Sequence, residues 1–121
     1  MKRIVLLVSL AVLLLAGCDW WHHEPSPVYV TGEMRVEGTV THANIFFRAF
    51  DGVGMNEQYE VALPWSYTDD HAQAEDSFYL SAQSSDAAGD LTISVLIDGV
   101  PLASETTAAP FGFVAIYGVI P

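Results

Sequence analysis

The chain has 121 residues and is strongly acidic, with 15 Asp and Glu residues against four Lys and Arg residues and a formal net charge of −11. This length is enough for one domain and too short for two. Because phosphate backbones repel a surface of this sign, the composition argues against nucleic-acid binding.

The N-terminus has the charge and size pattern of a secretory signal. A basic start at Lys2 and Arg3 precedes an apolar stretch over residues 4–16. That stretch is too short for a spanning helix, which needs about 20 apolar residues. It ends in Leu-Ala-Gly-Cys at residues 15–18, which resembles the lipobox of bacterial lipoproteins. The resemblance implies that residues 1–17 are a cleaved lipoprotein signal peptide and that Cys18 carries acyl chains, such as palmitate. The alternative is an ordinary signal with a chance cysteine.

Removal of the signal peptide makes the chain still more acidic. Arg35 and Arg48 remain against 15 carboxylates, so the mature formal charge is 2 − 15 = −13. Anionic lipid headgroups repel such a chain, so the acyl chains on Cys18 must hold it at the membrane. We therefore expect a lipid-anchored protein on the extracytoplasmic side of a bacterial membrane. Because Cys18 is the only cysteine, the domain has no internal disulfide to stabilise it.

Residues 18–27 are predicted to be the lipidated cysteine and a tether, since they contain two prolines and no apolar period. Trp20 and Trp21 follow the lipid directly, and indoles favour the headgroup region of a bilayer. The alternative is that both indoles are buried against the domain. The imidazoles of His22–Glu24 suit Zn or Cu, but a mobile tether fixes no ligand geometry, so we expect no metal there.

From residue 28 onward, the sequence is typical of short strands joined by turns. Runs rich in Val, Ile, Thr, Phe and Tyr alternate with Gly, Pro, Asp and Asn, and no stretch has a sustained helical period. Asp98-Gly99 predicts a type I′ hairpin turn, because both central residues of that turn need positive φ. The predicted strands are Val28–Val36, Ala43–Phe50, Glu57–Leu63, Trp65–Thr68, Phe78–Gln83, Leu91–Ile97, Val100–Thr106 and Phe111–Ile120.

These elements predict an all-β fold for residues 28–121. We expect an immunoglobulin-like antiparallel β-sandwich of seven to eight strands, with a small barrel as the alternative. The period of two along each strand assigns its faces. The predicted core residues are Ile45, Phe47, Leu63, Trp65, Phe78, Leu80, Ile93, Val95 and Ile97.

Phe46 and Phe50 fall on the outward face of their predicted strand. Two interpretations are open: either the N-terminal strand or a loop covers them, or they form an exposed apolar patch that faces a partner. The second interpretation makes these two residues the candidate partner-facing site.

Three further segments, in order, resemble the small mycobacterial membrane protein family (MmpS). They are Leu63–Ser66, Tyr79–Gln83 and Ile97–Gly99, and the similarity covers roughly residues 33–118. The resemblance implies a small extracytoplasmic β-sandwich that accompanies proton-driven exporters of the resistance-nodulation-division (RND) type and helps to move lipids or siderophores. It does not imply an enzyme.

This chain departs from that family in two respects. Family members hold themselves in the membrane with an uncleaved helix, whereas this chain has the predicted lipid on Cys18. Some members carry a cysteine pair where this chain has Ile93 and Ile116, and an Ile pair can replace a bridge by packing. The resemblance therefore bears more directly on the fold than on the transporter partnership.

The densest set of potential metal ligands lies in the predicted loop Asp69–Asp76. Asp69, Asp70 and His71 are followed by Glu75 and Asp76, and Ca²⁺ takes oxygen ligands from loops of this kind. The spacing matches no EF-hand, so a solvated acidic loop between strands is the favoured interpretation.

Catalysis has no recognisable signature in the sequence. A nucleophile needs an oriented base, yet no Gly-x-Ser-x-Gly motif occurs, and the only thiol is assigned to lipid. We therefore expect no enzyme and no cofactor. Two functions remain: a non-enzymatic accessory or interaction module for an RND-type exporter or envelope protein, or a lipoprotein that binds a small amphiphilic ligand.

Overall fold

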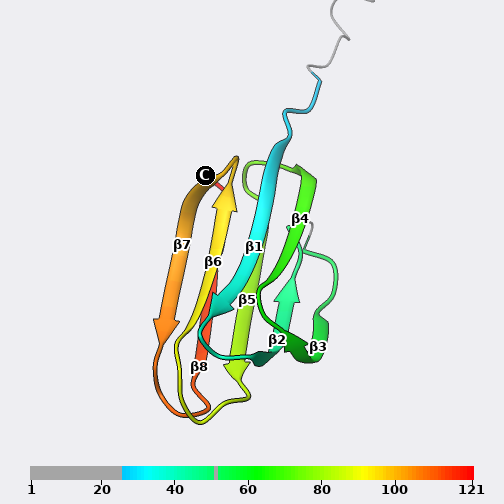
Figure 1. The fold of residues 1–121 in the computed structure, drawn as a ribbon. Helices are drawn as coiled ribbons and strands as arrows, with labels where there is room; N and C mark the ends of the chain where they lie inside the picture. Colours follow the sequence, from blue (N-terminus) through cyan, green and yellow to red (C-terminus); the bar gives the residue numbers. More distant parts are fainter. Residues whose placement is uncertain (1–25, 51) are drawn as a thin grey trace, which may run out of the picture.

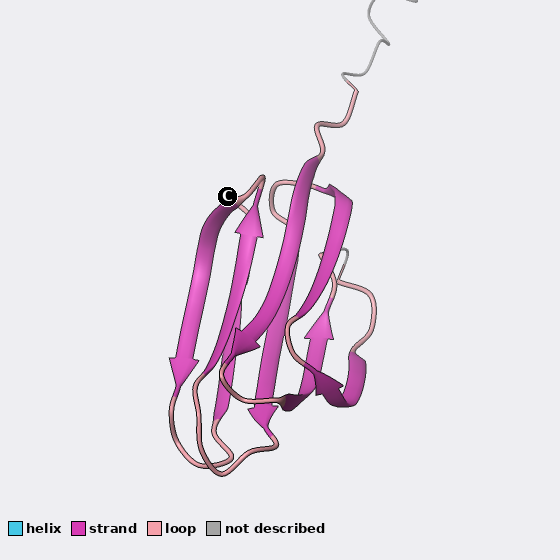
Figure 2. Ribbon diagram, viewed as in Figure 1, coloured by secondary structure: helices cyan, strands magenta, loops and turns pink. Residues whose placement is uncertain are grey.

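A computed structural model describes residues 26–50 and 52–121, all of which are strand, turn or loop (Figures 1 and 2). The predicted signal peptide, Cys18, the tryptophan pair and His22–Glu24 lie outside the described residues. None of the described residues forms a helix long and apolar enough to cross a membrane. The strands are β1 (Val30–Gly38), β2 (His42–Arg48), β3 (Asn56–Ala62), β4 (Trp65–Ala72), β5 (Ser77–Ser84), β6 (Leu91–Ile97), β7 (Val100–Thr107) and β8 (Phe113–Val119).

The strands form two stacked antiparallel sheets, with the orders β4-β1-β6-β7 and β3-β2-β5-β8. Only the β2–β3 and β6–β7 hairpins stay within one sheet, and every other connection passes from one sheet to the other (Figure 1). Two separate sheets confirm the predicted sandwich and exclude the barrel. The start of β1 and the C-terminus lie at the same end of the sandwich, which we call the tether end.

Six strands follow the order of an immunoglobulin-like sandwich. In that fold, strand E lies beside strand B, and the other sheet contains C′, C, F and G. Here β4 lies beside β1, and the second sheet runs β3-β2-β5-β8. On the other side of β1, β6 takes the place of strand A and forms a hairpin with β7. The fold is therefore immunoglobulin-like, with a hairpin in the position of its first strand.

One turn lies where the sequence predicted it, and one strand end does not. Asp98 and Gly99 have φ values of +50° and +79°, and Ile97 pairs with Val100, so the predicted β6–β7 hairpin turn is confirmed. The end of β4 is not where the sequence predicted it, because the strand continues four residues past Thr68. Pairing with β1 extends it, since Ala72 lies opposite Val30.

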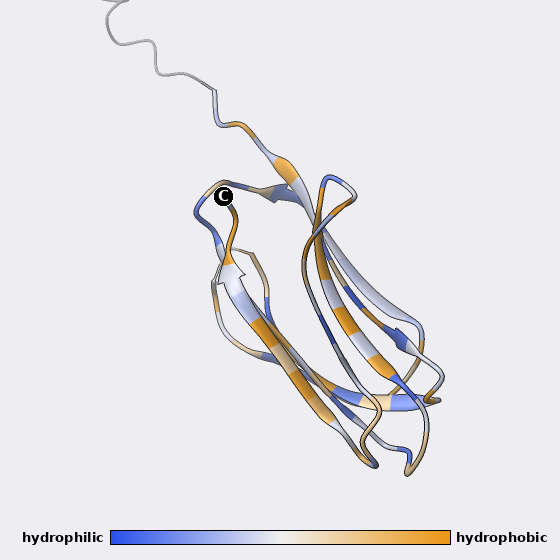
Figure 3. Cartoon of the chain, turned by 90° about the vertical axis from the view of Figure 1, so that its left-hand side faces the viewer, coloured by the Kyte–Doolittle hydropathy of each residue, from blue (hydrophilic) through white to orange (hydrophobic). Residues whose placement is uncertain are grey.

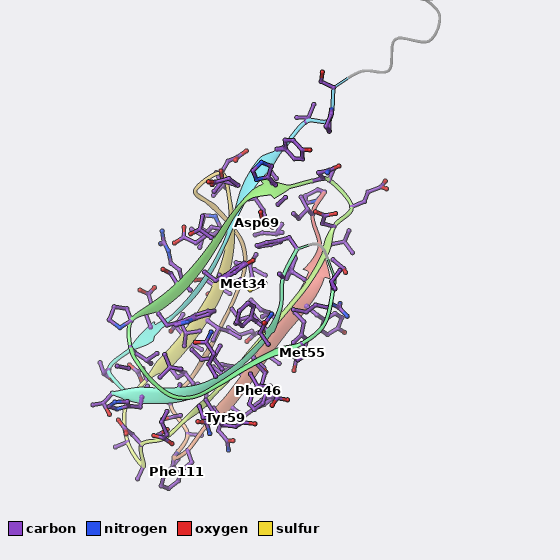
Figure 4. All side chains as sticks on the ribbon, turned by 90° about the vertical axis from the view of Figure 1, so that its right-hand side faces the viewer. Met34, Phe46, Met55, Tyr59, Asp69 and Phe111 are labelled. Carbon is purple, nitrogen blue, oxygen red and sulfur yellow. The ribbon has the colours of Figure 1, made fainter. Side chains whose placement is uncertain are left out.

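The core lies between the two sheets, and most of its predicted members are buried. Six of the nine are buried, whereas Leu63, Trp65 and Ile97 are half-buried at its border. Met34 of β1 is also buried, and Figure 4 shows it between the sheets. The six buried predicted residues are Ile45, Phe47, Phe78, Leu80, Ile93 and Val95.

Phe50 belongs to the core, which corrects the prediction that it faces outward. β2 ends at Arg48, and a turn follows in which the Gly52 N–H donates to the Ala49 carbonyl at 2.9 Å. Alternation ends with the strand, so the Phe50 ring turns inward. It lies beneath Gly32 of β1, where a β-carbon would come within 2.5 Å of the ring. Coverage by the N-terminal strand is thus confirmed for Phe50, which cannot be part of an exposed patch.

Gly38 allows the end of β1 to pass against the β5–β6 loop. Its φ is +145°, and a β-carbon there would overlap the Asp90 carbonyl oxygen. We expect Gly38→Ala to lower the free energy of unfolding by about 2 to 3 kcal/mol, measured by urea denaturation. Gly54→Ala is the matched control, because Gly54 also has positive φ but has nothing within 4 Å of the added carbon. It should cost about 1 kcal/mol, and equal losses would contradict the proposed overlap.

Candidate functional site

Aromatic side chains gather on the outer face of sheet β3-β2-β5-β8. The register places Arg48, Tyr79 and Tyr117 in one row across β2, β5 and β8. Tyr117 is 82% exposed, one of the most exposed large apolar side chains in the described chain. Together these side chains form what we call the aromatic face. Its members are Phe46, Tyr59, Tyr79, Phe113 and Tyr117.

Phe46 lies on this face, as the sequence predicted, but it is only half exposed. Its ring meets the Tyr59 ring edge-on, with centroids 5.7 Å apart and planes at 89° (Figure 4). The Tyr59 hydroxyl donates to a Glu57 carboxylate oxygen at 3.0 Å, and this hydrogen bond raises the pKa of Tyr59. The pair of rings therefore forms a fixed border of the aromatic face at the β2–β3 side.

The aromatic face is nearly free of charge, unlike the rest of the molecule. β2, β5 and β8 contain no Asp or Glu, and Arg48 is their one Arg or Lys residue. In the other sheet, β1, β4 and β7 all carry charged residues, and on β1 the Arg35 Nε lies 2.6 Å from a Glu33 oxygen. This contact raises the pKa of Arg35. Carboxylates are thus absent from β2, β5 and β8, and Glu57 on β3 lies at the border of the aromatic face.

Arg48 supplies the aromatic face with a half-buried cation. Its Nη2 lies 3.5 Å from the Ser77 hydroxyl, a long hydrogen bond, and its Nε is buried without an acceptor among the described residues. A guanidinium beside aromatic rings can bind a carboxylate or stack on another ring. This row therefore offers both apolar contact and one strong donor group.

Sequence reasoning found Phe46 but missed the part of the face that lies on β8. Phe113 and Tyr117 alternate with Val114 and Ile116, and only the structure shows that the first pair is exposed and the second is buried. Both sets are apolar, so the alternation carried no polarity signal. The absence of any charge in residues 113–119 was the one available hint that this strand is unusual.

A second surface lies at the tether end. A shallow groove of about 310 Å³ is lined almost entirely by apolar side chains, among them Val30, Leu102 and Ile120. Val28 and Val100 border it and are mostly exposed. Ligand pockets usually measure about 300 to 1,000 Å³, so the groove is at the lower limit for a small ligand.

Only the second half of the predicted loop Asp69–Asp76 is a loop, because β4 extends to Ala72. Asp69, Asp70 and His71 lie on β4, where successive side chains point to opposite faces. The Asp69 carboxylate accepts the His71 backbone N–H at 2.8 Å, and the Asp76 carboxylate accepts the Gln73 N–H at 2.9 Å. Residues 26–50 and 52–121 contain no group of three or more His, Cys, Asp or Glu residues that could hold a metal ion. The Asp69 and Asp76 carboxylates therefore accept backbone hydrogen bonds, one along a sheet edge and the other in a turn.

Comparison with known proteins finds no family model and no curated protein that match this chain. The MmpS resemblance therefore remains an expectation from the sequence. The two surfaces described above are the features of the structure that bear on function.

Proposed function

We propose that this protein is a membrane-anchored lipoprotein whose extracytoplasmic sandwich is a non-enzymatic interaction module. The observation that carries the proposal is the aromatic face, an exposed surface whose strands β2, β5 and β8 contain no carboxylate, on a chain of net charge −11. Monomeric soluble proteins rarely expose contiguous apolar surface without a partner to cover it. Tyr117 and Phe113 are the side chains that we expect such a partner to contact.

The sequence supports a partner within the cell envelope. The lipobox places the acyl chains on Cys18, and residues 19–27 reach roughly 30 Å when fully extended. The sandwich would therefore stay near the bilayer, where membrane proteins are its neighbours. The MmpS resemblance favours an RND-type exporter among them, with another envelope protein as the broader candidate. No nucleophile–base motif is recognisable in the sequence, and the proposal assigns the chain no catalytic activity.

A second function is favoured by the apolar groove at the tether end. A lipoprotein that binds a small amphiphile would place the apolar part of its ligand there, against Val30, Leu102 and Ile120. The predicted ligand site on the Phe46 and Phe50 face loses one of its two rings, because Phe50 is buried.

One cross-linking experiment separates the two functions. A photoreactive benzoylphenylalanine replaces Tyr117 on the aromatic face or, in the matched variant, Leu102 on the border of the groove. After irradiation of intact cells, we expect the Tyr117 variant to form an adduct with a membrane or envelope protein and the Leu102 variant to form none. Mass spectrometry identifies the adducts. A lipid-sized adduct at Leu102, with no foreign protein at Tyr117, would overturn the first function in favour of the second.

A further inference from the structure

We propose that β8 is a pairing edge to which a second copy of this chain adds its own β8. The edge strand of a sheet presents unpaired N–H and C=O groups, and proteins protect such edges with charged residues or proline. The sandwich has four edge strands, namely β4 and β7 in one sheet and β3 and β8 in the other. This inference concerns self-association and goes beyond the proposed function.

Three of the four edges are protected, and β8 is not. Strand β8 contains no charged residue and no proline over Phe113–Val119. The protecting residues on the other edges are Asp69 and Asp70 on β4, Glu57 and Glu60 on β3, and Pro101 and Glu105 on β7.

The free backbone groups of β8 belong to the same residues that form its exposed face. In an antiparallel pair, alternate residues exchange hydrogen bonds with the neighbouring strand. The Ser84 N–H donates to the Gly112 carbonyl, and the Ile120 N–H donates to the Asp76 carbonyl, so the even-numbered residues face β5. The odd-numbered residues therefore direct their N–H and C=O groups to the open edge. Figure 3 shows how apolar this strand is along its length.

The strand is complementary to itself. A two-fold axis at Ile116, the middle residue of β8, pairs the whole strand with its copy. Phe113 then lies opposite Val119 and Ala115 opposite Tyr117, so each large side chain meets a smaller one on the outer face. No like charges meet, and every outward N–H and C=O of the strand has a partner. Such isologous pairing is typical of two-fold dimers.

The distribution of charge favours a second copy over a different partner at this edge. A basic partner would be attracted to the other sheet, where β1 and β4 carry carboxylates. Two copies of a chain with net charge −11 repel one another in most orientations. β2, β5 and β8 contain no Asp or Glu, and β8 is the one edge strand among the described residues without either, so copies can approach there at low electrostatic cost. The pair would join two aromatic faces into one eight-stranded outer surface.

Disulfide trapping in membranes tests this register. Ala115→Cys and Tyr117→Cys are expressed separately and together in the full chain. These two positions are chosen because residues opposite one another in a hydrogen-bonded pair lie about 5.5 Å apart, within disulfide range. We expect mild oxidation to give a disulfide dimer mainly when both variants are present. Leu102→Cys with Ser104→Cys on edge strand β7 is the matched control, and the unsubstituted chain, with Cys18 alone, sets the background. Mixed dimers no more abundant than those of the control pair would overturn the proposal.

A charge on the edge provides an independent measurement. Ala115→Lys places an ammonium group on an exposed position of β8, and Ser104→Lys places one on exposed β7. We expect Ala115→Lys to weaken self-association at least tenfold, by sedimentation of the detergent-solubilised protein, and Ser104→Lys to leave it unchanged. Thermal melting of both variants checks that they remain folded. If pairing is absent while Tyr117 still forms a foreign adduct, this inference fails and the proposed function stands. If pairing occurs and Tyr117 forms no foreign adduct, the inference stands and the proposed function fails.

Discussion

Phe50→Ala is expected to lower the free energy of unfolding by about 3 to 5 kcal/mol, because it removes a large ring from a fully closed site. Phe50 is 0% exposed, and its ring centroid lies 6.0 Å from that of Phe78. Gly32 leaves just enough room for the ring, so the surrounding backbone cannot collapse readily into the space. Native domains have stabilities of about 5 to 15 kcal/mol, so this single change removes a large part of the total. Urea denaturation followed by circular dichroism measures the loss.

Phe46→Ala is the matched control, since it deletes the same atoms from the outer face. Phe46 is half-buried and loses chiefly its edge-on contact with Tyr59. We expect a loss of about 1 to 2 kcal/mol, the scale of one partly buried aromatic pair. A larger loss for Phe46 than for Phe50 would mean that the chain does not turn inward after β2.

The Cys18→Ala variant is expected to accumulate as a precursor that keeps residues 1–17 and carries no acyl chain. The thiol is the attachment point that the lipobox resemblance assigns, and signal cleavage in lipoproteins follows lipid addition. Mass spectrometry of the N-terminal peptide distinguishes the precursor from the mature form directly. Ser9→Ala, within the apolar stretch, is the matched control and should be processed like the unsubstituted chain. If Cys18→Ala were still cleaved and released from the membrane, the chain would have an ordinary secretory signal instead.

The fold could be predicted largely from local sequence because most strands have one polar and one apolar face. The alternation of Leu91, Ile93 and Val95 with Thr92 and Ser94 leaves one arrangement in which the apolar side chains are buried, and the structure has that arrangement. The Asp98-Gly99 turn could also be predicted, since an Asp-Gly pair suits the two positive φ values that the turn requires.

The sequence pattern gave wrong predictions where tertiary pairing or a turn decides whether a residue lies in a strand or which way its side chain points. Asp69 and Asp70 suggested a loop because they are charged, but pairing with β1 holds them in a strand. Phe50 was placed outward on the assumption that β2 continues, whereas the turn after Arg48 reverses its direction. For Asp69 and Asp70 the deciding contact is with β1, far away in sequence, whereas for Phe50 it is the turn, and Gly32 of β1 then covers the ring.

The candidate site was predictable only in part, and the reason is the uniform character of β8. Phe46 was found because the period of two places it on the face opposite to the predicted core residues Ile45 and Phe47. Phe113 and Tyr117 could not be placed on a face in this way, since their neighbours in the strand are also apolar. The strand order, which places β8 at an edge, is the information that the sequence pattern lacks.

The position of β1 has a mechanical consequence for a tethered protein. β1 is the strand that follows the predicted tether in sequence, and it lies between β4 and β6. Traction on the tether therefore acts along β1 while hydrogen-bonded ladders hold it on both flanks. An edge strand could be peeled from its single neighbour one residue pair at a time, whereas extracting β1 requires two ladders to shear together. Under the proposed lipid anchor, the domain would be suspended from a strand that is held on both sides, which is the arrangement that resists opening by force.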